Sequence, residues 1–399
     1  MNLISKTGKY VFFTIIILVT IELFSYFILF SNNNEKPFFI NLDLLSGEEF
    51  NYKKIRDSYF IYDATLGYRF KPKSKAYALT SSPSGIPKLE EIIFLQIDKN
   101  GLVSTELNKD IDFKPRKDLF TIIISGGSTV SGWGATENNK TWPALLEKNL
   151  NNYFSSKANK ISSKRIRIIN AGVFGYQISQ EIKRFQEELI YLKPDLVILF
   201  NGINEKYNFF GNPVEYATHS KQLYMMNYFN NVLKNKESVF LPNTIRILHN
   251  FSYSNNKKFK LYPSDYYQME YRSQDLYYSK VKQFESICAG EEIKFHFFLQ
   301  PILGVGNKKM SIQESKLINF FGSKFYPKKW DEYLPELKNF YLNVSKLDNF
   351  FDKPNYHNLQ FIFDEYEDTL YSDPRHYNNL GQKIIADKIF SLIKDDIIF

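Results

Sequence analysis

Four short segments of the chain carry groups that could together perform acyl-transfer chemistry. Ser128 follows two glycines and offers a hydroxyl, while Asp373 and His376 offer a carboxylate and an imidazole close together in the chain. Residues 170–175 and 201–205 offer glycine amides and an asparagine side chain. A serine hydroxyl needs a base, the base needs an orienting carboxylate, and the developing oxyanion needs N–H donors. These residue types therefore predict a serine esterase.

Buried strands must position these segments. Between the first three strands lie helical patterns at 142–154 and 178–192, each long enough for a right-handed crossover, and a last helix is expected over about 380–394. Strands that alternate with helices predict a parallel sheet with helices on both faces, an α/β fold. In such sheets ligands bind beyond the carboxyl ends of the strands. Ser128 and the segments 170–175 and 201–205 each follow a predicted strand and therefore lie at this edge. The strand-like apolar runs are 120–127, 167–171, 196–200 and 295–299.

In chain order, the four segments resemble the blocks of the SGNH, or GDSL-type, hydrolase family. Ser128 and the glycines before it stand where that family has Gly-Asp-Ser, and Asp373 and His376 match its Asp-x-x-His block. The resemblance covers about 118–399 and implies a flavodoxin-like parallel sheet, the SGNH hydrolase fold. It also implies that Ser128 is the nucleophile, His376 the general base and Asp373 the residue that orients the base.

The resemblance further implies which groups would bind the oxyanion. Gly175 of the second block and Asn204 of the third would donate to it, together with the backbone N–H of Ser128. Two positions depart from the family pattern. Gly127 stands in place of the usual Asp of the first block, and Glu205 in place of the usual Asp after the asparagine. Neither position carries the proton transfer, but the hydrogen bonding around Ser128 is expected to differ.

Other enzyme classes fit the sequence less well. The nucleophile elbow of an α/β-hydrolase, Gly-x-Ser-x-Gly, would need glycine where Val130 stands. The sequence has no Walker loop, no dinucleotide-binding Gly-x-Gly-x-x-Gly after a strand and no Cys/His metal spacing, so neither a cofactor nor a metal is expected. The remaining histidines match none of the blocks and are interpreted as structural or surface residues: His219, His249, His296 and His357.

Composition indicates a globular chain. Of the 399 residues, 44% are hydrophobic and 24% charged, which excludes a mainly disordered or fibrous protein. The formal net charge is +8, but the basic residues are spread along the chain, so nucleic acid is not expected as a partner. The single cysteine, Cys288, excludes an intramolecular disulfide and is expected to be buried near the end of an amphipathic helix.

Residues 10–30 form an apolar run that, as a helix, would be about 31 Å long, close to the thickness of a bilayer core. Lys6 and Lys9 precede it, so the positive-inside bias places the N-terminus in the cytoplasm and the rest of the chain in the periplasm or outside the cell. The following residues offer no small-x-small cleavage site, which favours an uncleaved anchor over a signal peptide. Glu22, inside the run, would have to be neutral or paired with a polar group of a membrane partner.

Three regions follow from these observations: a cytoplasmic tip and membrane anchor at 1–36, a β-rich leader at 37–117 and the catalytic domain at 118–399. Strand-like runs at 59–62 and 91–97, each next to a turn, indicate the leader. Its Leu66-Gly67-Tyr68 and Asn100-Gly101 weakly resemble the leader of membrane-anchored bacterial members of the family.

The catalytic domain is interrupted by an insert at about 205–280 that is rich in tyrosine and phenylalanine. The insert also holds a basic cluster at Lys257, Lys258 and Lys260. One interpretation is a lid or platform on which aromatic faces stack on sugar rings or cover an acyl chain. The other is a compact helical insert with its own aromatic core.

Together these patterns predict a membrane-anchored serine esterase that removes ester-linked acyl groups, O-acetyl groups above all, from a cell-envelope or secreted glycan. One alternative is an O-acyltransferase that acts with a membrane acyl-donor protein. The other is a catalytically silent glycan-binding or assembly protein.

Overall fold

The computed structural model describes residues 2–31, 59–63, 65–81, 87–105, 113–156, 164–207, 273–324, 330–347 and 350–399. The chain forms two compact units, one made of Met1–Asn51 with Asn227–Tyr266 and the other of Tyr52–Met226 with Tyr267–Phe399. Most of the predicted insert, residues 208–272, lies outside the described residues, so both interpretations of it stay open. The boundaries predicted at 36/37 and 117/118 also remain predictions.

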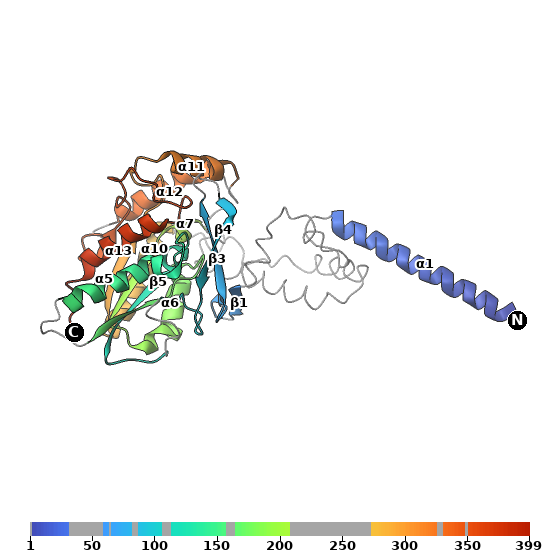
Figure 1. Ribbon diagram of the computed structural model, residues 1–399, viewed down its shortest axis with the longest axis horizontal. Coiled ribbons are helices and arrows are strands. Elements are labelled where there is room, and N and C mark those ends of the chain that lie inside the picture. Colours follow the sequence, from blue (N-terminus) through green and yellow to red (C-terminus); the bar gives the residue numbers. More distant parts are fainter. Residues whose placement is uncertain are drawn as a thin grey trace. The chain divides into compact units, whose positions relative to one another are not determined.

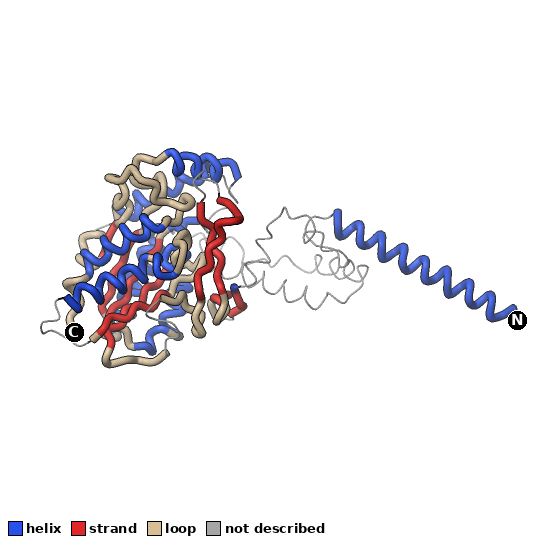
Figure 2. Tube along the Cα trace, in the orientation of Figure 1, coloured by secondary structure: helices blue, strands red, loops and turns tan. Residues whose placement is uncertain are grey.

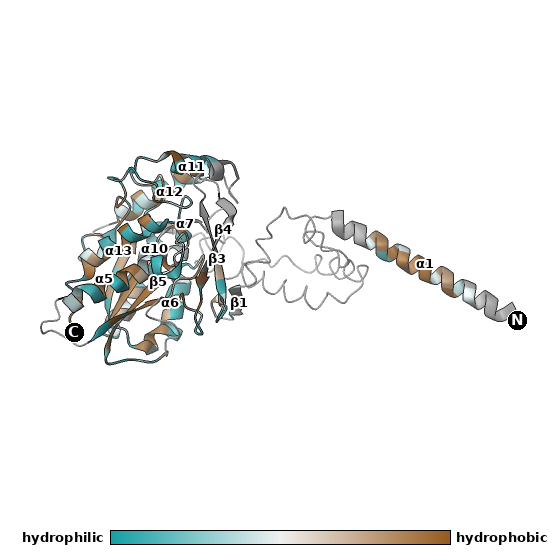
Figure 3. Cartoon of the chain, viewed as in Figure 1, coloured by the Kyte–Doolittle hydropathy of each residue, from teal (hydrophilic) through white to brown (hydrophobic). Residues whose placement is uncertain are grey.

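In the first unit the structure describes the helix α1 (Asn2–Ser31). Its large apolar side chains from Tyr10 to Phe24 are exposed, and Figure 3 shows the apolar middle of this helix. The hydroxyls of Thr14 and Thr20 donate to backbone carbonyls four residues earlier, which satisfies both within the helix. No helix in the described part of the chain is long and apolar enough to cross a membrane. The span predicted at residues 10–30 stays a prediction.

The second unit is built on a five-stranded sheet whose strands all run parallel. Its strand order is β6-β5-β7-β8-β9, or 2-1-3-4-5 in chain order, which is the flavodoxin-like order. The predicted parallel sheet of flavodoxin type is thus confirmed. Figure 2 shows the strands in red, with helices in blue beside them. The strands are β5 (Leu119–Gly126), β6 (Arg165–Asn170), β7 (Leu196–Asn201), β8 (Lys294–Leu299) and β9 (Tyr356–Asn358).

Helices cover both faces of this sheet, as the sequence predicts (Figure 1). Side chains alternate along a strand, so neighbouring residues enter different cores. Ile122 and Ile124 of β5 belong to the core shared with α5 and α13, whereas Ile123 belongs to the core shared with α6, α10 and α12. These helices are α5 (Trp142–Ser156), α13 (Asn379–Ile393), α6 (Ile178–Glu187), α10 (Ser273–Gly290) and α12 (Trp330–Ser345).

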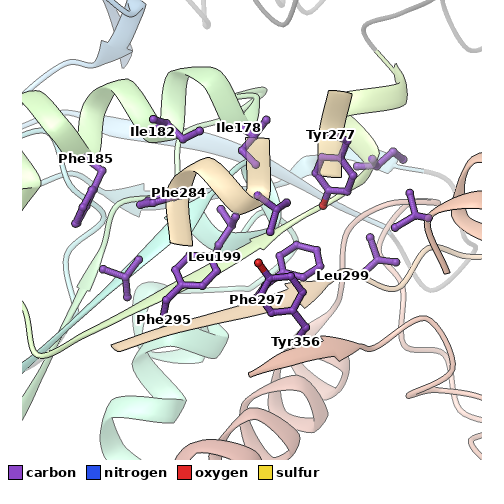
Figure 4. Close-up of a cluster of buried hydrophobic side chains, with 14 of the residues drawn as sticks. Ile178, Ile182, Phe185, Leu199, Tyr277, Phe284, Phe295, Phe297, Leu299 and Tyr356 are labelled. Carbon is purple, nitrogen blue, oxygen red and sulfur yellow. The ribbon is translucent and has the colours of Figure 1, made fainter. Parts of the chain in front are cut away.

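The larger core lies between α6, α10, α12 and the sheet. Figure 4 shows Ile182 and Phe185 of α6 beside Phe284 of α10, with Phe297 of β8 in the same cluster. Cys288 of α10 is fully buried in this core, and burial raises the pKa of its thiol to about 12. The expectation of a buried, unreactive cysteine is confirmed.

Two antiparallel hairpins precede the sheet, in the region where the sequence predicts β structure. Asp63 closes the first hairpin because its Oδ1 accepts hydrogen bonds from the N–H groups of Thr65 and Leu66, at 2.9 and 2.8 Å. Asp98 closes the turn after the second hairpin in a similar way. The hairpin strands are β1 (Phe60–Asp63), β2 (Gly67–Phe70), β3 (Lys75–Ser81) and β4 (Pro87–Gln96), of which β2 and β3 are not predicted from sequence.

Other elements differ from the sequence expectation. The helix predicted over 178–192 is α6 followed by a short 3₁₀ turn, η2 (Leu189–Leu192), which ends just before Pro194. The elements α11 (Ile312–Lys324), α12 and β9 are not predicted. Pro335 lies inside α12 and weakens its helical pattern, and β9 is too short to give a periodic signal.

Candidate active site

Three side chains predicted to act together form a continuous hydrogen-bonded chain. Ser128 begins the short helix α4 (Ser128–Ser131), just beyond the carboxyl end of β5, and its Oγ lies 2.7 Å from Nε2 of His376. Nδ1 of His376 lies 2.6 Å from Oδ2 of Asp373, in the loop before α13. With Asp373 ionised, Nδ1 carries the hydrogen, so Nε2 accepts a hydrogen bond from the serine hydroxyl.

The loop that carries Asp373 and His376 is closed on itself. Oδ1 of Asp373 accepts hydrogen bonds from the backbone N–H groups of Arg375 and His376, at 2.8 and 3.1 Å, and the N–H of Ser372 donates to the carbonyl of His376. Asp373 is only 9% exposed, and burial by itself would raise the pKa of its carboxyl. The charge and the hydrogen bond of His376, with the N–H of Arg375, outweigh burial and lower that pKa to about 2. The carboxylate is therefore ionised over the working range of most proteins.

His376 is held neutral by its surroundings. It is 6% exposed, and its ring stacks on the indole of Trp133 with the centroids 5.2 Å apart and the planes 26° apart. Burial lowers the pKa of His376 below 6.5, although Asp373 opposes the shift. A neutral imidazole with a free lone pair on Nε2 is what a general base requires.

Of the residues implied as oxyanion donors, Asn204 lies beside Gly127, next to Ser128 in the chain. Asn204 lies in α7 (Ile203–Tyr207), just after β7, and its Nδ2 donates to the carbonyl of Tyr176 at 2.8 Å. A Cβ built on Gly127 would lie 2.4 Å from that same Nδ2, so the amide of Asn204 lies directly against Gly127. The N–H of Ser128 has no intrahelical acceptor because it is at the start of a helix. Gly175 follows β6 with a φ of +75°.

This close approach explains why glycine stands at position 127. No side chain fits between the backbone there and the amide of Asn204 without moving one of them. The departure from the family's Gly-Asp-Ser pattern is therefore compatible with the site, since the space that an aspartate would need is already occupied by Asn204.

The second departure, Glu205, has a structural role next to the site. Its side chain is 1% exposed, and Oε1 accepts a hydrogen bond from the N–H of Ile178 at the start of α6, at 2.7 Å. Burial raises the pKa of Glu205 to about 8. Burial and the neighbouring Glu205 also raise the pKa of Glu181 well above its usual range, although Asn201 donates to Glu181. Glu205 is therefore protonated near neutral pH, and its hydrogen bond ties α7, which carries Asn204, to α6.

Sequence reasoning misses two aromatic residues of the site. Trp133 stacks on His376, and Tyr176 supplies the carbonyl that holds Asn204. Both lie within a few residues of a predicted position, but nothing in the local pattern distinguishes them from core aromatics.

The remaining histidines are not part of this constellation where they are described. Nδ1 of His296 lies 3.1 Å from Nε2 of His357, and Nε2 of His296 lies 3.1 Å from Asp396, so both histidines are structural, as expected. His219 and His249 lie outside the described residues. Within the described ranges, no group of three or more His, Cys, Asp or Glu side chains could hold a metal ion.

Comparisons with solved structures find several esterases and acylhydrolases. An acetyl xylan esterase from Geobacillus stearothermophilus is 15% identical, with a TM-score of 0.35 over 72% of this chain and 100% of that chain. A GDSL-like lipase from Bacteroides thetaiotaomicron is 12% identical, with a TM-score of 0.36 over 71% of this chain and 92% of that chain. A lipase/acylhydrolase from Enterococcus faecalis is 14% identical, with a TM-score of 0.36 over 70% of this chain and 97% of that chain.

No protein-family model matches the sequence, and no curated protein matches it significantly. Identities and TM-scores this low leave the reaction to be inferred from the site itself.

Replacing Glu205 with glutamine should flatten the dependence of stability on pH. In the unfolded chain the pKa of this carboxyl is about 4.3, whereas in the folded chain it is about 8. The unfolded state loses the proton first, so the free energy of unfolding falls as pH rises between these values. Glutamine keeps an acceptor for the N–H of Ile178 and carries no charge.

Urea unfolding at about pH 5 and pH 8 measures the effect. The wild-type chain should lose more stability between the two values than E205Q. Glu187→Gln, at an exposed glutamate of α6, is the matched control and should keep the wild-type slope. Equal slopes for wild type and E205Q would contradict a buried, protonated Glu205.

Proposed function

We propose that this chain is a serine esterase that uses Ser128 as nucleophile, His376 as general base and Asp373 to orient the base. The observation that carries the proposal is the chain of hydrogen bonds, 2.7 Å from Ser128 to His376 and 2.6 Å from His376 to Asp373. His376 takes the hydroxyl proton as Oγ attacks an acyl carbonyl, and then gives it to the leaving alcohol. Water, activated by the same imidazole, then hydrolyses the acyl-enzyme.

The oxyanion of each tetrahedral intermediate would accept hydrogen bonds from Gly175, from Nδ2 of Asn204 and from the N–H of Ser128. The contact of Asn204 with Gly127 supports this assignment, because it brings the amide next to the nucleophile. The bond from Asn204 to the carbonyl of Tyr176 fixes the orientation of the amide. Donors fixed in advance cost no reorganisation during the reaction.

The substrate and the location follow from the sequence. The proposed substrate is an O-acetyl ester on a cell-envelope or secreted glycan. Residues 10–30 would anchor the chain in a membrane, with the N-terminus in the cytoplasm and the catalytic domain in the periplasm or outside the cell. A membrane acyl-donor partner would make the same site an O-acyltransferase, and loss of activity would leave a glycan-binding protein.

Ser128→Ala should abolish esterase activity. The full-length chain is assayed with 4-nitrophenyl acetate, and kcat/KM should fall by at least roughly 10³-fold because the nucleophile is lost. Ser391→Ala, at an exposed serine hydroxyl of α13, is the control and should keep full activity. Hydrolysis that does not depend on Ser128 would refute the esterase and favour the silent alternative. Transfer of acetyl to an added oligosaccharide, dependent on Ser128, would favour the acyltransferase.

The dependence of kcat/KM on pH should show that the general base is already deprotonated below pH 7. Because burial lowers the pKa of His376 below 6.5, kcat/KM should rise with pH through an apparent pKa under 6.5 and level off above it. Asp373, with a pKa of about 2, stays ionised throughout this rise. A limb that rises only above pH 7 would contradict a buried neutral base.

Gly127→Ala should impair catalysis through Asn204. The new Cβ would lie 2.4 Å from Nδ2, so the amide must move away from its bond to Tyr176. We expect kcat to fall by roughly 10- to 100-fold with little change in KM. A double-mutant cycle with Asn204→Ala gives the control, because G127A should cost much less once the amide is gone. Additive losses would show that the glycine acts by another route.

A further inference from the structure

The first hairpin contacts the loop that carries Gly175 through a pair of tyrosines. The hydroxyl of Tyr68, in β2, donates to the carbonyl of Phe174 at 2.7 Å, and the hydroxyl of Tyr176 donates to the carbonyl of Tyr68 at 2.6 Å. Both tyrosines are fully buried, and their rings pack edge to face with centroids 5.3 Å apart. The hairpin and the loop thus exchange two buried hydrogen bonds.

The carbonyl that Tyr68 contacts belongs to the same peptide unit as the N–H of Gly175. A peptide unit is planar and trans, so its C=O and N–H point in opposite directions, and fixing the oxygen fixes the direction of the N–H. A hydrogen bond to the oxygen also polarises the unit and strengthens the N–H as a donor. Gly175 has a φ of +75°, and glycine adopts positive and negative φ values about equally readily. The direction of the Gly175 N–H is therefore not fixed by its own backbone and needs support from outside the loop.

Aromatic packing supports the same loop from both sides. The ring of Phe174 packs against Phe70 of β2, with centroids 4.9 Å apart, and against Trp133, with centroids 4.7 Å apart. Trp133 in turn stacks on His376. One more contact fixes the hairpin to α6, because Nε2 of Gln180 donates to the carbonyl of Leu66 at 2.7 Å.

We infer that Tyr68 is a positioning residue of the esterase. Its hydroxyl orients and polarises the peptide unit between Phe174 and Gly175 so that the Gly175 N–H donates to the oxyanion. The inference rests on the proposed function and deepens it, because it makes the N-terminal hairpin a part of the catalytic apparatus. Tyr68 acts through Gly175 and does not touch the substrate.

Tyr68→Phe in the full-length chain removes only the hydroxyl. With 4-nitrophenyl acetate, kcat should fall roughly 10-fold while KM changes less than about 2-fold, because the lost interaction acts on the oxyanion. Phenylboronic acid gives a second readout. Oγ of Ser128 adds to the boron as His376 takes the hydroxyl proton, which gives a tetrahedral anion. The dissociation constant of phenylboronic acid should rise by about the same factor as kcat falls.

Tyr356→Phe is the matched control. Tyr356 is also buried, and its hydroxyl donates to Glu285 at 2.9 Å, in a part of the larger core that does not include the Gly175 loop. Both variants should lower the Tm, but Y356F should keep the wild-type kcat and boronate affinity. Thermal unfolding is measured for each variant to check that it is folded at the assay temperature.

The outcomes separate this inference from the proposed function. If S128A abolishes hydrolysis while Y68F keeps wild-type kcat and boronate affinity, the role of Tyr68 is overturned and the esterase stands. If Y68F and Y356F lose kcat equally, the effect is one of stability and the inference also fails. If S128A retains hydrolysis, the proposed function itself fails, whatever Y68F does.

Discussion

The hydrogen bond between Ser128 and His376 is the interaction on which the rest of the site depends, and Trp142 holds its two sides together. The indole N–H of Trp142 donates to the carbonyl of Thr129, next to the nucleophile, at 3.0 Å. The backbone N–H of Trp142 donates to Gln382 of α13 at 2.9 Å, and Gln382 also contacts the carbonyl of Tyr377, next to the base. The start of α5 therefore fixes the two reacting side chains relative to each other. Packing of α5 and α13 on one face of the sheet turns a contact between distant segments into a rigid one.

Two buried carboxyls near the site have opposite pKa shifts, and the groups around each carboxyl explain the difference. The charge of His376 in its protonated form stabilises the carboxylate of Asp373 against burial, as do the hydrogen bonds from the His376 ring and from two backbone N–H groups. Glu205 accepts from one backbone N–H and has no such compensation, so it holds its proton. The fold thus keeps an anion where the imidazole needs one. It keeps Glu205, in the neighbouring layer between α6 and α7, neutral near pH 7.

Much of the fold could be predicted because buried parallel strands give long apolar runs, and four of the five strands of the sheet are of this kind. The fifth, β9, has three residues and no periodicity, so its place in the sheet is decided by tertiary packing. Asp373 and His376 could be recognised because their spacing is local, and Ser128 because it follows two glycines at the end of a predicted strand. The reason for Gly127, the stacking of Trp133 and the bond from Tyr68 could not, since each is a contact between segments far apart in the chain.

The distance along the chain between the nucleophile and its base also has a consequence for biosynthesis. The two residues are 248 positions apart. At a synthesis rate of about 5–20 residues per second, Ser128 is added to the chain roughly 12–50 s before His376. During that interval the serine is an ordinary alcohol and cannot attack esters. The proposed catalytic pair can form only after residue 376 has been added, so hydrolytic activity would appear late in the synthesis of the chain.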